Sequence, residues 1–327
     1  MLVSVIIPTY GRALYIETAI QSVIEQTYKD IEIIVVDDNG LGTEIQKATQ
    51  KIVEKFDNII YIPLATNSGG AVARNVGISK AGGKWVTFLD DDDFFLPNYI
   101  EKMVAEIERC RFPVVYEAQW YCLKNEIAFC SKKQPIKIEG RIWEKVLCAN
   151  VPISIFLLFD REQILKNQLF DETFRAYDDY DFWLNLSKEF PFGCVTEPLT
   201  VVRRENNGHL STNVKKVREG LERLSAKWMP LLTAQESDLF EIFLNKHKEK
   251  IERLQLMESA NDSLWKRIKA IHFLSDKYHL SAKEKAMDYF ECFVENGVLK
   301  LKLSIFRRNY NIINISQQKL EKEESNL

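Results

Sequence analysis

Residues 85–93 read Trp85-Val86-Thr87-Phe88-Leu89-Asp90-Asp91-Asp92-Asp93, and this stretch decides the fold. It predicts a short, mainly apolar strand that runs directly into four aspartates. Strands without polar alternation are typical of a sheet that is covered on both faces. In open α/β sheets, ligands bind beyond the carboxyl ends of the strands. The aspartates therefore lie where such a sheet would hold its site.

The residues before this stretch alternate between strand and helix patterns. Further elements are predicted as strands over 2–7, 31–36 and 59–62, and as helices over 14–26, 43–55 and 71–79. This alternation indicates βαβ units. We expect an α/β fold with a Rossmann-like, mostly parallel sheet flanked by helices.

The character of the sequence changes after about residue 213. Residues 214–287 are rich in Lys, Glu and Leu and lack strand alternation, which predicts helices. We therefore divide the chain into an α/β domain over residues 1–213 and a mainly helical C-terminal extension over residues 214–327.

Charge and composition exclude several classes of protein. The net charge of −3 provides no global positive field for nucleic acid. No run of 18 apolar residues predicts a membrane span, and the first residues lack the pattern of a signal peptide. The six cysteines form no CxxC pair, so we expect free thiols rather than a zinc knuckle. These features predict a cytoplasmic protein.

Polar residues follow three of the predicted strands. Thr9 and Tyr10 follow the first strand, Asp37-Asp38 follows the second, and Asp90–Asp93 follows the fourth. Because the carboxyl ends of parallel strands share one edge of a sheet, we expect these residues to form one site.

The four consecutive aspartates favour a cation site. Like charges at short range are unfavourable unless a cation is bound or the side chains point apart. Carboxylates combined with phosphate oxygens suit Mg²⁺ or Mn²⁺. The alternative is a solvated acidic turn in which Asp93 caps a helix. The other polar strand ends favour the metal.

A second acidic cluster and one histidine are further candidates. In Asp178-Asp179-Tyr180-Asp181, one aspartate can cap a helix, and another can act as a general base. His209 follows Arg203-Arg204 and could ligate a metal or bind phosphate, although a solvated histidine is the alternative.

Five short motifs occur together in this chain. They are Pro8-Thr9-Tyr10-Gly11-Arg12, Val35-Val36-Asp37-Asp38, Asn67 to Asn75, Phe88-Leu89-Asp90-Asp91-Asp92-Asp93 and Asp178-Asp179-Tyr180-Asp181-Phe182-Trp183. In this order and spacing, residues 1–213 resemble the family 2 glycosyltransferases. The resemblance implies the fold called GT-A and an inverting transfer of a sugar from a nucleotide-diphosphate donor, usually a UDP-sugar.

The resemblance also implies roles for single residues on the donor side. Thr9, Tyr10 and Asp38 match contacts to the donor nucleotide, and Arg74 matches a donor-side arginine. Asp90 matches the residue that faces the ribose or the sugar.

The remaining roles concern the metal and the base. Asp92 matches the direct metal ligand, and His209 matches a histidine near the diphosphate. Asp179 matches the catalytic base. The family often has Glu-Asp where Asp178-Asp179 stands here, and a small residue where Asp91 stands, so the choice of metal-ligating carboxylates among Asp90–Asp93 stays open.

The predicted function is transfer of a sugar to an acceptor hydroxyl in glycan or polysaccharide biosynthesis, on a lipid-linked or protein-linked acceptor. A nucleotidyltransferase would need a glycine-rich basic loop after the first strand, and residues 8–12 are too short and too poor in glycine. A scaffold protein that kept the fold would have lost acidic residues, and none is lost.

The extension offers two interpretations. Residues 298–310 place Lys and Arg among apolar residues, which could form a surface for anionic lipid at the inner face of the membrane. The alternative is a packed edge or a contact between copies of the chain, which would make a homo-oligomer.

Overall fold

The computed structural model describes residues 1–327 except 125–126, 132–134, 168, 204–212, 260–309 and 315–327. The chain divides into two compact units. The first contains residues Met1–Asn206 and Asn311–Leu327, and the second contains residues Asn207–Tyr310. The boundary at residue 213 between a catalytic domain and an extension stays a prediction.

A seven-stranded sheet forms the centre of the first unit, in the order β10-β6-β9-β4-β1-β2-β3. Its strands are β1 (Val3–Thr9), β2 (Ile31–Asp37), β3 (Ile59–Pro63), β4 (Trp85–Phe88), β6 (Val114–Glu117), β9 (Leu157–Asp160) and β10 (Phe192–Val195). The pairs β1–β2, β1–β4, β2–β3 and β6–β10 are parallel, and β9 runs antiparallel to β4 and β6. The predicted mostly parallel sheet is confirmed.

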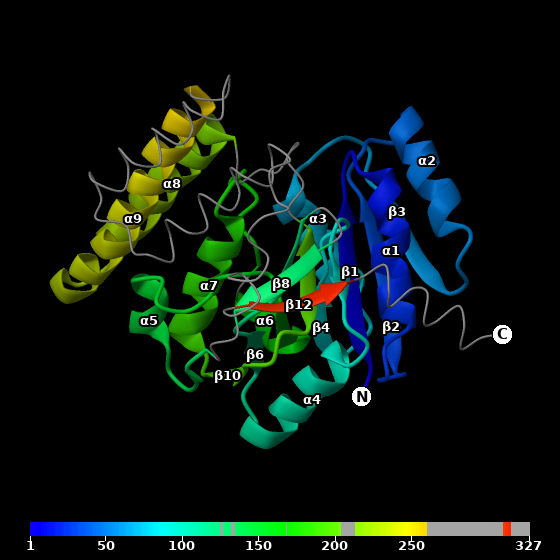
Figure 1. The fold of residues 1–327 in the computed structure, drawn as a ribbon, viewed down its shortest axis with the longest axis horizontal. Coiled ribbons are helices and arrows are strands. Elements are labelled where there is room, and N and C mark those ends of the chain that lie inside the picture. The colour runs from blue at the N-terminus through cyan, green and yellow to red at the C-terminus, as the bar shows by residue number, and fades with distance from the viewer. Residues whose placement is uncertain (125–126, 132–134, 168, 204–212, 260–309, 315–327) are drawn as a thin grey trace. The chain divides into compact units, whose positions relative to one another are not determined.

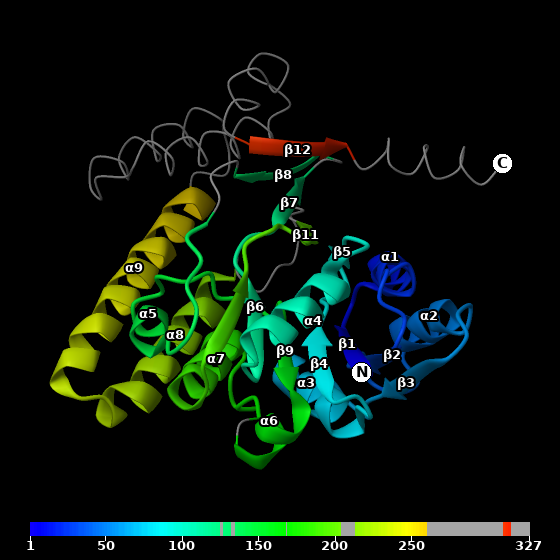
Figure 2. The ribbon, with the colours of Figure 1, turned by 90° about the horizontal axis from the view of Figure 1, so that it is seen from below.

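Helices cover the sheet on both sides. They are α1 (Ala13–Ile24), α2 (Glu44–Val53), α3 (Gly70–Lys80), α4 (Tyr99–Cys110), α5 (Trp143–Leu147), α6 (Arg161–Asn167) and α7 (Asp178–Glu189). Figures 1 and 2 show α1 and α4 on one face and α3 and α6 on the other. This double cover explains why β1 is apolar on both faces, with Val5, Ile6 and Ile7 fully buried.

Aromatic packing holds α7 against the sheet. The rings of Phe170 and Phe182 stack with centroids 4.0 Å apart, and Phe88 of β4 meets Phe170 edge-on at 5.4 Å. Trp183 packs edge-on against Tyr116 of β6 at 5.2 Å. Full burial of such a side chain contributes about 1.5–3 kcal/mol. These contacts fix the start of α7, which carries the second acidic cluster.

A second sheet has the order β12-β8-β7-β11-β5. Its strands are β5 (Phe94–Phe95), β7 (Tyr121–Lys124), β8 (Ile127–Ser131), β11 (Thr200–Arg203) and β12 (Tyr310–Asn314). Glu117, fully buried at the end of β6, accepts hydrogen bonds from the amide of Leu199 at 2.6 Å and from the amide and hydroxyl of Thr200 at 3.0 and 2.5 Å. This carboxylate therefore sets the start of β11.

Residues 214–259 of the second unit are helical, as the sequence predicts, and the rest of the predicted helical region, 260–287, lies outside the described residues. The unit contains α8 (Val214–Trp228), a 3-10 turn (Met229–Leu231) and α9 (Ala234–Ser259). The side chain of Asn213 caps α8 by accepting a hydrogen bond from the amide of Lys216 at 3.0 Å. Nowhere in the described chain is a helix both long and apolar enough to cross a membrane.

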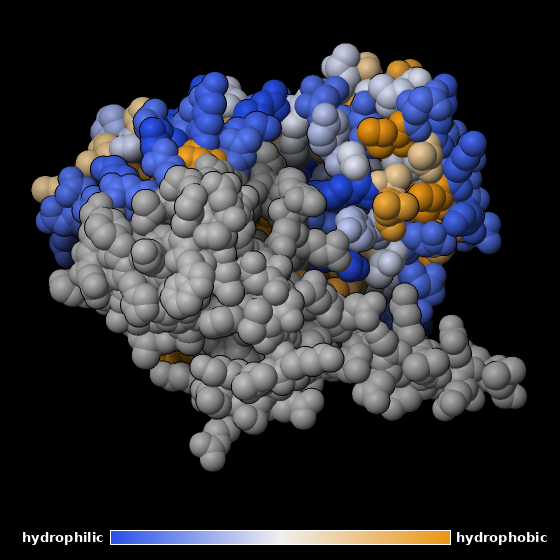
Figure 3. Space-filling model, turned by 45° about the horizontal axis from the view of Figure 1, so that its top comes forward, coloured by the Kyte–Doolittle hydropathy of each residue, from blue (hydrophilic) through white to orange (hydrophobic). Residues whose placement is uncertain are grey.

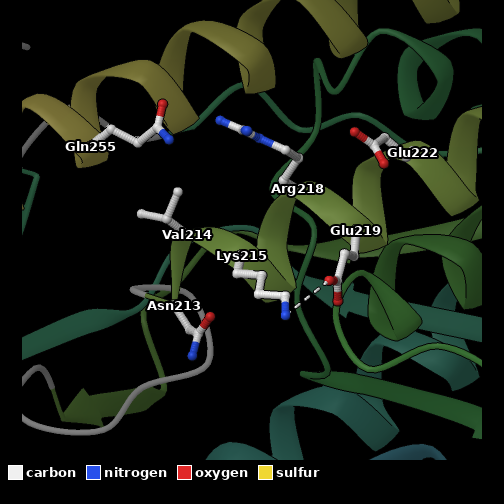
Figure 4. Close-up of a pocket in the computed structure, with 7 residues that line it drawn as sticks. All are labelled: Asn213, Val214, Lys215, Arg218, Glu219, Glu222 and Gln255. Carbon is white, nitrogen blue, oxygen red and sulfur yellow. Dashed lines mark ion pairs between the residues drawn. The ribbon is translucent and has the colours of Figure 1, made fainter.

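The helical unit has a hollow of about 610 Å³ between α8 and α9. Figure 4 shows its lining, in which Lys215 pairs with Glu219 at 3.9 Å and Gln255 comes from α9. The hollow contains none of the predicted site residues.

Candidate active site

Asp91 joins the carboxyl ends of β1 and β4. Its carboxylate is fully buried and accepts hydrogen bonds from the hydroxyl of Thr9 at 2.7 Å and from the amide of Tyr10 at 3.3 Å. The amide of Asp38 also donates to the carbonyl of Thr9 at 2.9 Å, so the structure brings the three predicted polar strand ends into contact. The hydroxyl proton of Thr9 is donated to Asp91, so Thr9 stabilises the position of the acid cluster.

Arg12 lies against two members of the acid cluster. Its Nη2 is 3.0 Å from Oδ1 of Asp91, and its Nη1 donates to Oδ2 of Asp92. Burial raises the pKa of Asp91 to about 7, although Arg12 counteracts this rise. No role for Arg12 is predicted from the sequence, where its local signal is a position two residues after the polar strand end at Thr9-Tyr10.

Asp93 faces a different partner from the one expected. Its Oδ1 accepts a hydrogen bond from the amide of Arg203 at 2.9 Å, and Nε of Arg203 donates to the carbonyl of Asp92 at 3.2 Å. The alternative in which Asp93 caps a helix is wrong, because the chain continues into β5 and α4 begins only at Tyr99. Asp91 and Asp93 are therefore bound to protein groups.

Arg74 connects the acid cluster to α7. This arginine of α3 is 9% exposed. Its Nη2 lies 3.0 Å from Oδ1 of Asp90, and its Nη1 lies 2.7 Å from Oδ2 of Asp178. The guanidinium carbon lies 5.6 Å from the ring centroid of Phe170. The two acidic clusters, which are far apart in sequence, thus meet at one cation.

Asp179 lies in the first turn of α7 and accepts a hydrogen bond from the amide of Tyr180 at 2.7 Å. Burial and, after it, the charge of Asp178 raise the pKa of Asp179 to about 6, while Arg74 counteracts the rise. A carboxylate whose pKa approaches neutrality is suited to accept a proton from a hydroxyl.

Asp38 organises the loop that precedes α3. Its buried carboxylate accepts hydrogen bonds from the amides of Ser68 and Gly69 at 2.6 and 2.7 Å and from the side chain of Asn67 at 3.1 Å. Gly69 has a φ of +95° and lies next to Arg175, whose Nη1 donates to the carbonyl of Ser68. This contact between Asp38 and the loop has no local signal in the sequence, because Asp38 and Ser68 are 30 positions apart.

Among the predicted nucleotide contacts at the ends of β1 and β2, which are Thr9, Tyr10 and Asp38, only Tyr10 is exposed. It is 56% exposed, whereas Thr9 is 2% and Asp38 is 3% exposed. The nucleotide-binding roles of all three residues stay predictions. Of the three side chains, that of Tyr10 is accessible to a ligand without any rearrangement.

The groups at the acid cluster fit a hard divalent cation as a partial ligand set. Asp92 supplies carboxylate oxygens, and Mg²⁺ or Mn²⁺ commonly completes such a set with substrate phosphates. Among the described residues, no group of three His, Cys, Asp or Glu side chains forms a complete site. His209, the second predicted ligand, lies outside the described residues. Metal binding therefore stays a prediction.

A hollow of about 330 Å³ lies beside Arg12, between the starts of α1 and α2. Leu14 and Tyr15 line it from α1, and Glu44, Ile45 and Ala48 line it from α2. Figure 3, in which the upper edge of Figure 1 is turned forward, shows apolar side chains at the right of the view, on the side of these helices. Leu14 and Ile45 are 90% and 47% exposed.

Comparison with known proteins identifies the family. The profile described as "Glycosyl transferase family 2" matches residues 4–146. A putative teichuronic acid biosynthesis glycosyltransferase, TuaG of Bacillus subtilis, is 32% identical over 223 residues, which are 67% of this chain and 85% of TuaG. The chain belongs to glycosyltransferase family 2. An uncharacterized glycosyltransferase of Haemophilus influenzae is 30% identical over 66% of this chain and 74% of its own length.

Other relatives in this family are longer than this chain. An uncharacterized glycosyltransferase of Rickettsia conorii is 27% identical over 94% of this chain, but over only 48% of its own length. For a relative in Rickettsia bellii, the matched share is 79% of this chain and 36% of the relative. The chain thus spans about a third to a half of these two glycosyltransferases.

Solved structures confirm the predicted fold of the family 2 chain. Staphylococcus aureus TarS 1–349 superposes with a TM-score of 0.55 at 20% identity, covering 84% of this chain and 80% of TarS 1–349. The complex of TarS 1–349 with UDP-GlcNAc gives a TM-score of 0.57 at 18% identity, covering 91% and 88%.

Proposed function

We propose that this family 2 glycosyltransferase transfers a sugar from a UDP-sugar to an acceptor hydroxyl, with inversion at the anomeric carbon. The observation that carries this proposal is the bridge from Asp90 through Arg74 to Asp178. It joins the end of β4, where a donor would bind, to the helix that presents Asp179. Donor and base are then held within one site, and such positioning supplies much of the rate.

Two comparisons support the choice of donor and acceptor. TarS 1–349, which shares the fold, has been solved in complex with UDP and with UDP-GlcNAc. TuaG is named for teichuronic acid biosynthesis, so a growing polysaccharide or a lipid-linked glycan is the acceptor that we favour over a protein-linked one. A nucleotidyltransferase is disfavoured, because the turn from β1 to α1 comprises only Tyr10–Arg12.

The reaction uses Asp179 as the general base. Asp179 accepts the proton of the acceptor hydroxyl, and the resulting oxygen nucleophile bonds to the anomeric carbon. The bond between that carbon and the diphosphate oxygen breaks on the opposite face, so the configuration inverts. A Mg²⁺ or Mn²⁺ ion held by Asp92 and His209 would neutralise charge on the departing diphosphate. Tyr10, Asp38 and Thr9 would contact or support the nucleotide.

The test is nucleotide release from a panel of nucleotide sugars, with and without Mn²⁺. We expect slow, Mn²⁺-dependent release from one UDP-sugar, which Asp92→Ala abolishes. With acceptor present, Asp179→Asn should keep donor binding and lose transfer by about 10²–10⁴-fold. Normal transfer by Asp179→Asn would remove Asp179 from the role of base. Absence of nucleotide binding by calorimetry would favour a scaffold protein instead.

Three further parts of the proposal concern the whole protein. Residues 1–213 form the catalytic domain, and the extension over 214–327 mediates self-association or peripheral contact with the cytoplasmic face of the membrane. Liposome flotation with and without residues 298–327 tests the membrane contact, and equal flotation would disprove it.

A further inference from the structure

The acid cluster requires a positive charge within the protein. Asp91 and Asp92 are adjacent and are 0% and 6% exposed. Two neighbouring carboxylates removed from water repel each other strongly unless a cation lies between them. Arg12 supplies this cation, since one guanidinium nitrogen faces Asp91 at 3.0 Å and another donates to Asp92.

The two carboxylates differ in the role that we assign to them. Asp91 also accepts hydrogen bonds from Thr9 and from the amide of Tyr10, so it keeps partners if Arg12 leaves. Asp92 is the carboxylate to which we assign the metal. The guanidinium nitrogen and a metal ion cannot both occupy the same face of its Oδ2 atom, because both need direct contact with that oxygen.

The Arg12 side chain is accessible from solvent. It is 39% exposed, in contrast to the carboxylates that it binds. The hollow of about 330 Å³ between α1 and α2 is lined by Arg12 and, from α2, by Glu44, Ile45 and Ala48. A displaced guanidinium would therefore have space to enter beside the acid cluster.

We propose that Arg12 is the resident counter-cation of the acid cluster and that a divalent metal binds Asp92 only by displacing it. This inference rests on the proposed function, because it concerns the same metal. Its consequence is that the chain without donor binds metal weakly, since each metal ion must first break the ion pair between Arg12 and Asp92. Arg12 thereby keeps the buried acids neutralised until the metal arrives.

The main experiment measures Mn²⁺ affinity of the full chain without nucleotide, from the electron paramagnetic resonance signal of free Mn²⁺. We expect Arg12→Gln to bind Mn²⁺ at least about 10-fold more tightly than the wild type, because a positive charge that repels Mn²⁺ and competes for Asp92 is removed. Arg12→Gln combined with Asp92→Asn should lose this gain. The matched control is Arg109→Gln, because Arg109 is an exposed arginine on α4 that pairs with Glu106 and Glu139; its Mn²⁺ affinity should equal that of the wild type.

A second measurement follows Arg12 itself in the wild-type chain. The Nε–H signal of Arg12, assigned by its loss in Arg12→Gln, should shift when Mg²⁺ is added, while the signal of Arg109 should not. Melting temperature gives a check on folding. Without metal, Arg12→Gln should melt at a lower temperature than the wild type, and Mn²⁺ should raise the melting temperature of Arg12→Gln more than that of the wild type.

The outcomes separate this inference from the proposed function. Equal Mn²⁺ affinity of the wild type and Arg12→Gln, or an Arg12 signal that stays in place while Mg²⁺ binds, would overturn the displacement and leave the proposed transfer intact. If neither chain binds Mn²⁺, with or without UDP, the displacement fails together with the metal in the proposed function.

Discussion

Arg74 donates a hydrogen bond from Nη1 to Oδ2 of Asp178 at 2.7 Å, across 104 positions of the chain. The same side chain pairs with Asp90, so one buried cation holds the end of β4 and the start of α7 together. Removing one partner of such a buried pair leaves a charge without compensation and is strongly destabilising. The position of Asp179 relative to the donor side therefore depends on Arg74.

Arg74 should control the pH dependence of transfer through Asp179. Arg74 lowers the pKa of Asp179, against the effects of burial and Asp178 that bring it to about 6. The base must be ionised, so kcat/KM of the wild type should rise with pH through about 6. In Arg74→Met the pKa of Asp179 should be higher, so the acid limb of the kcat/KM profile should move to higher pH by about 1 unit.

The pH–rate profile of transfer checks this, with Arg109→Met as the control for loss of an arginine outside the site. Arg74→Lys keeps the charge and should shift the acid limb less. A lower kcat with an unchanged acid limb would show that Arg74 only maintains the fold.

Asp38 should act through the loop that it holds. In Asp38→Asn, one oxygen becomes an amide group that faces the backbone donors of Ser68 and Gly69, so these hydrogen bonds weaken. We expect faster hydrogen exchange at both amides and an unfolding free energy lower by about 1.5–3 kcal/mol. Weaker UDP binding with unchanged exchange at Ser68 and Gly69 would instead show that Asp38 acts only by contacting the nucleotide.

The distance between α3 and β1 should depend on Gly77. A Cβ at Gly77 would clash with Cγ2 of Ile6, which is fully buried. Gly77→Ala should lower the unfolding free energy by about 1–3 kcal/mol through overpacking, despite the better helix propensity of alanine. Urea denaturation measures the change. Gly82→Ala is the control, because its Cβ would meet Glu32 only at 3.5 Å. Equal midpoints for the two variants would contradict the tight contact.

Glu117 should make the stability of the protein depend on pH. Burial raises the pKa of Glu117 from 4.5 to about 8, against its hydrogen bonds from Thr200 and Leu199. Between these two values the folded state binds more protons than the unfolded state, so the unfolding free energy should fall as pH rises through this interval.

Glu117→Gln cannot titrate, so its unfolding free energy should fall less steeply with pH, by up to about 1.4 kcal/mol per pH unit. Urea denaturation from pH 5 to 8 compares the two proteins. Other buried carboxyls contribute equally to both curves, so parallel curves would show that Glu117 keeps an ordinary pKa in the folded state.

Local patterns were sufficient for the first four strands of the sheet and for the position of the site. The apolar runs that became β1, β2 and β4 are readable because a strand covered on both faces takes mainly apolar side chains. The placement of Asp90–Asp93 beyond β4 follows from the general rule that ligands bind at the carboxyl ends of strands. Both are properties of short, continuous segments, which is why the sequence by itself determined them.

The partners of the charged residues were decided only by the tertiary structure. No local pattern shows that Asp91 turns inward to Thr9, that Arg12 lies on Asp91 and Asp92, or that Arg74 reaches Asp178. These pairs join segments tens of residues apart, and packing of helices on the sheet selects them. Buried charges then take whichever opposite charge the packing brings within reach, because an unpaired charge in the interior is strongly unfavourable.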